Sequence, residues 1–309
     1  MVKNSAKKKQ AQAKRSAKRS ARSKEMKASK TAENTSKRSI LSLLPKHTKK
    51  ANFPTFAEAI AESWNKTYFI ARGRPVGQNQ MRIVPLGTGF LCGRQCMLTC
   101  AHCIVNTKNE DAMAKHHDGD TYFFVARDGA GRYHSSQLQL KLDSDLFIYQ
   151  DTDAAIIELP ESFYTNGQKV FKHPDDHFLL ADDMIGIGSD VGVIGYPFQQ
   201  LKPNTGQSGI DISGVLVRVD KGVINTAYKD GASQLLKYEF TMSFNPGNSG
   251  GPIIRPSDGK VIAWVRGFNS TAMEISGGNG EKAKIYAHYS EGLSTANLKG
   301  IAKKHNLAF

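Results

Sequence analysis

The chain has 309 residues, of which 39% are hydrophobic and 9% aromatic, so it can bury one large core or two smaller ones. Residues 1–50 hold 17 of the 42 basic side chains but only two of the 28 acidic ones, which leaves 25 basic and 26 acidic side chains for the rest. The formal net charge of +14 therefore belongs to the first 50 residues. Residues 51–309 are nearly neutral, so the high isoelectric point does not indicate what they bind.

The basic tail (residues 1–50) has almost no apolar side chains to bury. It cannot offset the entropy cost of becoming ordered, so we predict that it is disordered. Its charge favours an arm that binds a polyanion, either nucleic acid or an acidic membrane surface. The alternatives are a solvating tail, a nuclear-import signal or, less in keeping with the excess of Lys over Arg, a transit peptide.

No apolar run approaches the ~20 residues that cross a bilayer, so we expect no transmembrane segment. The first apolar run, Ile40–Leu44, is too short and too far from the start to be a secretory signal. We therefore expect an intracellular protein, located in the cytoplasm or nucleus, or in a host cell or virion if it is viral.

After Pro54, apolar residues at helical spacing predict a short helix within residues 53–64. Short apolar runs then alternate with Gly, Asp, Asn and Pro, a pattern typical of an all-β barrel or sandwich. The predicted strands are residues 66–73, 85–92, 96–100, 121–128, 134–142, 154–159, 191–196, 214–226, 235–242, 252–256, 260–267 and 284–290. The final stretch, 293–307, predicts a helix capped near Ser294.

All four cysteines lie in one stretch, at Cys92, Cys96, Cys100 and Cys103, with His102 among them. A zinc or iron–sulfur site is one interpretation, but the spacing fits no common ligand pattern. We favour buried thiols on two strands of a hairpin and expect no metal. A Cys92–Cys103 disulfide is conceivable but disfavoured in a reducing compartment.

His102 follows the apolar strand MLTC, and a strand-to-helix corner there would point its imidazole outward. An ordinary His titrates near 6.5 and can accept a proton at neutral pH. Asp153 stands just before the apolar run AAIIEL, where a carboxylate could orient one tautomer of that imidazole. Asp151 is the competing acid, and Asp153 is preferred because the apolar run begins immediately after it.

Ser249 lies in the sequence GNSGG, between glycines that allow unusual backbone angles. A serine nucleophile needs an adjacent base and two backbone N–H groups aimed at the developing oxyanion. The N–H groups of Gly247 and Ser249 are the natural pair. The alternative is an ordinary glycine-rich hairpin.

The three stretches GTGF…LTCAHC, DAAIIEL and GNSGGP resemble, in this order, the chymotrypsin-like serine peptidases. The sequence IGYPF and the GNSGGP stretch look most similar to the HtrA-type branch. The resemblance implies two β-barrels, with His102 and Asp153 in residues 51–180 and Ser249 in residues 181–309. It implies a serine endopeptidase that acts on protein or peptide substrates through a Ser-His-Asp triad and an acyl-enzyme, without a cofactor.

The resemblance also locates a substrate pocket, with Ser243 at its base and Arg266, Gly267 and Phe268 in its wall. Because Ser243 is neutral, a preference for Lys or Arg is not supported. We expect a small or apolar residue before the cleaved bond, unless Arg266 selects an acidic one. Asn248 stands where trypsin-type enzymes place Asp, so we expect no activation by cleavage of the amino terminus.

A basic tail joined to such a domain is also similar in layout to an alphavirus capsid protein. The alternative function is therefore a viral capsid-like or polyprotein autoprotease whose tail binds RNA.

Overall fold

The structure, a computed structural model, describes residues 55–309 apart from 78–79, 106–114, 129, 162, 164–175, 198–201, 204–209, 212–213 and 277–281. The predicted disorder of the basic tail lies outside the described residues. Residues 51–309 belong to one compact unit. None of its described helices is both long and apolar enough to cross a membrane.

The first described element is α2 (Phe56–Ala61), and it fulfils the prediction of a short helix after Pro54. The Thr55 side chain accepts a hydrogen bond from the Glu58 N–H, and the Glu58 carboxylate accepts one from the Thr55 N–H. This reciprocal cap satisfies two N–H groups that a helix start otherwise leaves without partners. A single 3-10 turn, η1 (Trp64–Lys66), leads into the first strand.

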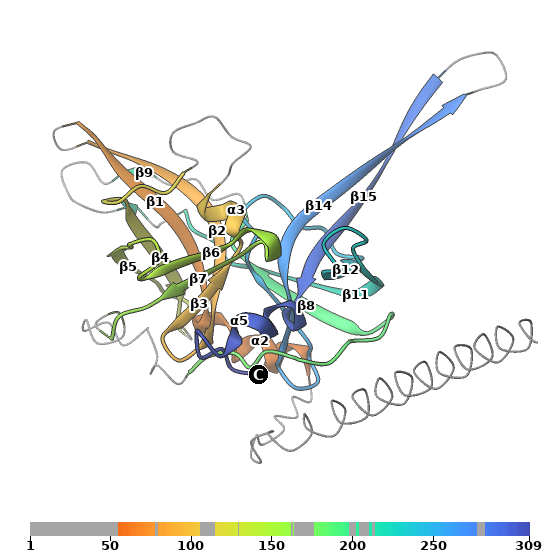
Figure 1. Ribbon diagram of the computed structural model, residues 1–309, viewed down its shortest axis with the longest axis horizontal. Helices are drawn as coiled ribbons and strands as arrows, with labels where there is room; N and C mark the ends of the chain where they lie inside the picture. The colour runs from red at the N-terminus through yellow and green to blue at the C-terminus, as the bar shows by residue number, and fades with distance from the viewer. Residues whose placement is uncertain are drawn as a thin grey trace, which may run out of the picture. The chain divides into compact units, whose positions relative to one another are not determined.

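The first half of the unit is a seven-stranded antiparallel sheet, coloured from orange to yellow-green in Figure 1. Its order is β5-β4-β1-β2-β3-β7-β6. The strands are β1 (Thr67–Gly77), β2 (Gln80–Gly93), β3 (Cys96–Thr99), β4 (Thr121–Arg127), β5 (Tyr133–Gln139), β6 (Leu146–Tyr149) and β7 (Ala154–Glu158). Side chains from β4 and from β6 and β7, far apart in this order, share one buried cluster, so the sheet wraps around its own core.

The second half is a closed six-stranded barrel with the order β11-β12-β15-β14-β13-β8. Its strands are β8 (Asp190–Gly195), β11 (Arg218–Lys229), β12 (Leu236–Phe240), β13 (Pro252–Ile254), β14 (Val261–Ser276) and β15 (Lys282–Ser294). The outer parts of β14 and β15 pair only with each other and extend beyond the barrel (Figure 1). A further short pair is formed by β9 (Lys202–Pro203) and β10 (Ile210–Asp211).

The chain ends in η4 (Thr295–Leu298) and α5 (Lys299–Ala302). The Ser294 hydroxyl accepts a hydrogen bond from the Ala296 N–H, so the predicted cap is present. The helix predicted over 293–307 is shorter, because residues 293–294 still belong to β15 and residues 303–306 form turns. Residues 305–309 then return to the first sheet, where Leu307 bridges to Gly93 and the Ala308 N–H donates to the Cys92 carbonyl at 2.8 Å.

The sheet and the barrel share a buried apolar cluster, which fixes one against the other. Its members come from β2 and β3 on one side and from β8, β13, β14 and β15 on the other, namely Phe90, Leu98, Ile194, Ile254, Trp264 and Leu293. Burying such side chains contributes roughly 1.5–3 kcal/mol each. The architecture is a chymotrypsin-like double barrel, which confirms the predicted all-β class. The predicted strand 284–290 lies in the outer part of β15, whereas the outer part of β14 (residues 268–276) and the short strands β6, β9 and β10 were not predicted.

Candidate active site

His102 is placed by a sharp turn from strand to helix. Strand β3 ends at Thr99, Cys100 is still extended, and the short helix α3 (Ala101–Ile104) begins at the next residue. The fully buried Arg72 donates from Nη1 to the Ile104 carbonyl at 2.9 Å and so holds the far end of this helix. The His102 side chain is 40% exposed, which leaves one edge of the ring open to an incoming group.

Asp153 lies at the end of the 3-10 turn η3 (Gln150–Thr152), directly before β7. Its carboxylate accepts hydrogen bonds from the His102 backbone N–H at 3.0 Å and from Nδ1 at 2.9 Å. Its own carbonyl accepts from the Ala101 N–H and from the Trp264 indole. The competitor Asp151 is exposed in the same turn. Because Nδ1 donates to Asp153, Nε2 is the nitrogen left to accept a proton.

Ser249 lies in a turn that the first sheet holds from outside the barrel. The Thr88 N–H donates to the Ser249 carbonyl at 2.9 Å, and the Thr88 hydroxyl donates to the Gly247 carbonyl at 2.7 Å. The Ser249 hydroxyl donates to the Arg266 carbonyl at 3.3 Å, and no hydrogen bond joins it to His102 among the described residues. Catalytic hydrogen bonds are often long or absent before substrate binds.

The turn carries two N–H groups suited to an oxyanion. Gly247 has a φ of +98°, which favours glycine. The Asn248 N–H donates to the Asn245 carbonyl, whereas the N–H groups of Gly247 and Ser249 have no acceptor within the described part of the chain. A pair of adjacent donors without partners can stabilise a negative oxygen.

Arg266 links the predicted pocket to the other site residues. Its Nη1 pairs with the buried carboxylate of Glu291 at 2.6 Å, and its Nε lies 3.6 Å from Asp153. Glu291 also accepts from the Tyr228 hydroxyl at 2.9 Å and lies 3.6 Å from the ammonium of Lys237. Sequence reasoning missed Glu291, although an acid inside the strand sequence AHYSEGLS is a signal for a buried ion pair.

The other predicted pocket residues are more open. An added side chain at Gly267 would meet no described atom within 4 Å, and Phe268 is 56% exposed. Ser243 is exposed and makes no hydrogen bond to His102, Asp153 or Ser249 within the described residues. The structure therefore brings Arg266 to the other site residues, whereas the described hydrogen bonds do not link Ser243 to them.

The ionisable groups around His102 shift one another's pKa values. Burial lowers the pKa of His102, but the hydrogen bond to Asp153 and the contact with Cys103 outweigh it and raise the pKa to about 10. A hydrogen bond with Cys100, together with contact with His102, outweighs burial and lowers the pKa of the Cys103 thiol to about 6. Burial raises the pKa of Cys100 well above its ordinary value. The protonated ring and the Cys103 thiolate therefore stabilise each other.

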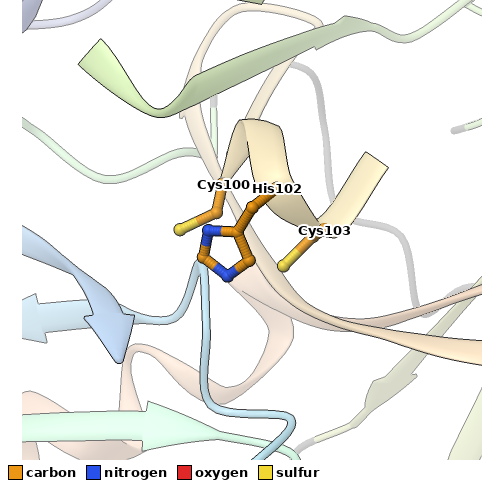
Figure 2. A group of neighbouring side chains, drawn as sticks. All are labelled: Cys100, His102 and Cys103. Carbon is orange, nitrogen blue, oxygen red and sulfur yellow. The ribbon is translucent and has the colours of Figure 1, made fainter. Parts of the chain in front are cut away.

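All four cysteines are free and buried, as favoured from the sequence. Cys92 and Cys96 lie on β2 and β3 with their sulfur atoms 3.8 Å apart. Cys100 and Cys103 flank His102 at the start of α3, and Figure 2 shows the imidazole with the two thiols beside it.

Comparison with known proteins finds relatives among the peptidases. A family model described as the trypsin-like peptidase domain matches residues 87–263. The chain is 25% identical over 179 residues to the Arabidopsis thaliana protein "Protease Do-like 2, chloroplastic". That match covers 57% of this chain and 23% of the plant protein, so the chain spans under a quarter of the relative's length. With a family match over more than half of its residues and a chymotrypsin-like double barrel, the chain belongs to the trypsin-like peptidase family of serine peptidases.

Proposed function

We propose that the chain is a serine endopeptidase whose nucleophile is Ser249, with His102 as base and Asp153 as the group that orients it. The observation that carries the proposal is the 2.9 Å contact between His102 Nδ1 and the Asp153 carboxylate, next to the turn that bears Ser249. This contact fixes the tautomer in which Nε2 can accept the serine proton.

In the proposed reaction, Ser249 Oγ attacks the carbonyl carbon of a peptide bond while His102 takes its proton. The N–H groups of Gly247 and Ser249 stabilise the oxyanion that forms. His102 then donates the proton to the leaving amine, and an acyl-enzyme remains on Ser249. Water, activated by the same imidazole, releases the acyl group. Asp153 stays ionised throughout and stabilises the imidazolium.

The pocket favours a small or apolar residue before the cleaved bond. The guanidinium of Arg266 already pairs with Glu291 and lies near Asp153, so it is poorly placed to select an acidic side chain. The open space at Gly267 and the exposed ring of Phe268 offer apolar contact. A peptide library cleaved by the full chain would test this preference, and a preference for Asp or Glu would contradict it.

The decisive test of the reaction is labelling with a serine-directed fluorophosphonate. We expect rapid labelling of the wild-type chain and none of Ser249→Ala, because only an activated hydroxyl reacts with the probe. The matched control is Ser233→Ala, an exposed serine in the loop between β11 and β12. Equal labelling of wild type and Ser249→Ala, or no labelling of the folded wild-type chain, would reject the proposal.

A further inference from the structure

The start of helix α3 gathers three side chains that bind soft metals. The two sulfur atoms of Cys100 and Cys103 and a ring nitrogen of His102 all lie within 4.8 Å of one another (Figure 2). Two thiolates and one imidazole are ligands that Zn²⁺ prefers, and three protein ligands leave a fourth position for water. The spacing of all four cysteines fits no common ligand pattern, so the sequence favoured buried thiols. The structure separates them into two pairs, only one of which includes a histidine.

The distances suit a tetrahedral ion after a small adjustment. Zinc bonds of about 2.3 Å to sulfur and about 2.0 Å to nitrogen place tetrahedral ligand atoms roughly 3.5–3.8 Å apart. The cluster would therefore need to contract by about 1 Å at its widest separation. A change of side-chain rotamers can supply a shift of this size.

Apart from the contact between Cys103 and His102, which coordination to a shared ion would replace, the interactions of the two thiols are weak. The Cys100 thiol donates to the Val265 carbonyl at 3.1 Å, and the Cys103 thiol lies 3.7 Å from the Ser249 carbonyl. Both are weak hydrogen bonds. Cys100 is fully buried and Cys103 is 6% exposed, whereas the neighbouring imidazole is open to solvent, so an ion would enter from the side of His102.

We propose that Cys100, His102 and Cys103 form a binding site for a thiophilic divalent cation such as Zn²⁺. Binding of the ion does not depend on peptidase activity. Its consequence does rest on the proposed function. An ion on Nε2 would occupy the nitrogen that accepts the Ser249 proton, and an ion on Nδ1 would displace the Asp153 carboxylate and leave the proton of a neutral ring on Nε2. A bound ion therefore switches the peptidase off.

The test uses the full chain, kept reduced with a phosphine, and Cd²⁺ as a spectroscopic probe. We expect one equivalent of Cd²⁺ to produce a thiolate-to-metal charge-transfer band, and Zn²⁺ to displace it. Cys100→Ala and Cys103→Ala should each weaken binding by at least about 100-fold, because each removes a direct ligand. The matched control is Cys92→Ala, which removes a thiol of equal burial from the pair that lacks a histidine. A band of equal strength in all three variants, or none in wild type, would overturn the site.

Three further measurements separate metal binding from folding defects and from peptidase activity. X-ray absorption of the Zn²⁺-loaded wild-type chain should show two sulfur ligands and one imidazole nitrogen, and a shell of oxygen alone would overturn the proposal. Ser249→Ala should bind Cd²⁺ like wild type. Zn²⁺ should also slow fluorophosphonate labelling of wild type, and a chelator should restore it. If the wild-type chain binds Cd²⁺ but is not labelled by the fluorophosphonate, the peptidase is rejected and the metal site is retained. If it is labelled but does not bind Cd²⁺, the metal site is rejected and the peptidase is retained.

Discussion

Asp153 has a left-handed backbone conformation, with a φ of 46°, that lets its carboxylate meet both the backbone and the ring of His102. Asp is among the few non-glycine residues that tolerate this region. Asn is another residue that tolerates this region, so Asp153→Asn removes the charge with little change in the backbone. The substitution therefore separates the electrostatic role of residue 153 from its structural role.

We predict that Asp153→Asn lowers the rate of fluorophosphonate labelling by roughly 10⁴-fold, because the imidazole loses its orienting carboxylate. The pH profile should change as well. In wild type the raised pKa of His102 means that the neutral ring becomes available as pH rises from about 6.5 towards 10. The variant should lose the part of this shift that Asp153 causes and keep the part that Cys103 causes, so its residual rate should level off at lower pH. Labelling rates measured from pH 6 to 10 check both effects, and an unchanged profile would contradict them.

The same pKa shift affects stability. A protonated His102 stabilises the fold because its pKa is higher in the folded chain than in the unfolded one. This contribution is complete below about pH 6.5 and is lost as pH rises through about 10.

The buried carboxylate of Glu291 depends on Arg266. Replacing Arg266 with Met removes the 2.6 Å ion pair and leaves the acid with Tyr228 and Lys237. We predict a loss of about 2 kcal/mol in the free energy of unfolding, below the cost for a fully buried pair because Arg266 is partly exposed. The double variant Arg266→Met/Glu291→Gln should recover part of this loss. Urea unfolding of wild type, both single variants and the double variant checks this, and additive losses would show that the pair is not coupled.

For single residues, local sequence was enough to propose His102, Asp153 and Ser249 as the catalytic residues, because each stands in a short sequence pattern that limits its role. Local sequence could not reveal the partners of Thr88 or Glu291. Thr88 acts through the Gly247 carbonyl, which lies 159 positions away, and Glu291 acts through an ion pair across two strands. Such partners follow only from the way the strands are paired.

Among the elements, the turn between Phe240 and β13 joins the barrel to the first sheet. Gly250 has a φ of +83°, and a Cβ at this position would collide with the Thr88 carbonyl and the Thr99 hydroxyl. Both contacts belong to β2 and β3 of the first sheet, whereas the Gly250 N–H donates to Val265 on β14. The glycine therefore permits the two halves to approach closely at the candidate site.

We predict that Gly250→Ala destabilises the fold by at least about 2 kcal/mol and abolishes fluorophosphonate labelling, through backbone strain and overpacking. Gly300→Ala is the matched control, because Gly300 lies in α5 with no described atom within 4 Å of an added Cβ. It should stabilise the chain by up to about 1 kcal/mol through helix propensity. Thermal or urea unfolding distinguishes the two, and equal effects would argue against steric restriction at Gly250.

Most strands were predictable because buried runs alternate with turn residues, but β6 was not. Its sequence LFIY is a short continuous apolar run, which periodicity alone cannot assign to a strand rather than a helix. The outer part of β14, residues 268–276, was missed for a different reason: it pairs through its backbone with the predicted strand 284–290, and such pairing requires no apolar run.

For the whole molecule, the net charge is concentrated in the basic tail, and the proposed peptidase reaction of the double barrel does not require it. Residues 1–50 hold 17 basic and two acidic side chains, whereas the rest of the chain is nearly neutral. Binding of nucleic acid or another polyanion by the basic tail therefore stays a prediction that can be tested apart from the peptidase.

We predict that deletion of residues 1–50 abolishes binding to single-stranded RNA and heparin, and that wild-type binding weakens steeply as salt is added. Fluorophosphonate labelling should be unchanged, because none of the proposed site residues lies in the deleted segment. Filter binding at several salt concentrations checks the first part. Undiminished polyanion binding after the deletion would assign it to the double barrel instead.

The return of residues 305–309 to the first sheet has a consequence for the order of folding. The Ala308 N–H meets the Cys92 carbonyl 216 positions earlier in the chain, and the His305 ring meets Tyr149 and Glu158. A ribosome delivers these residues only after it has made every strand of both halves. The first sheet therefore cannot complete its packing while it is being synthesised, and contacts of such long sequence separation are slow to form. Until the last residues emerge, the nascent first half exposes the backbone edge and apolar surface that they will cover.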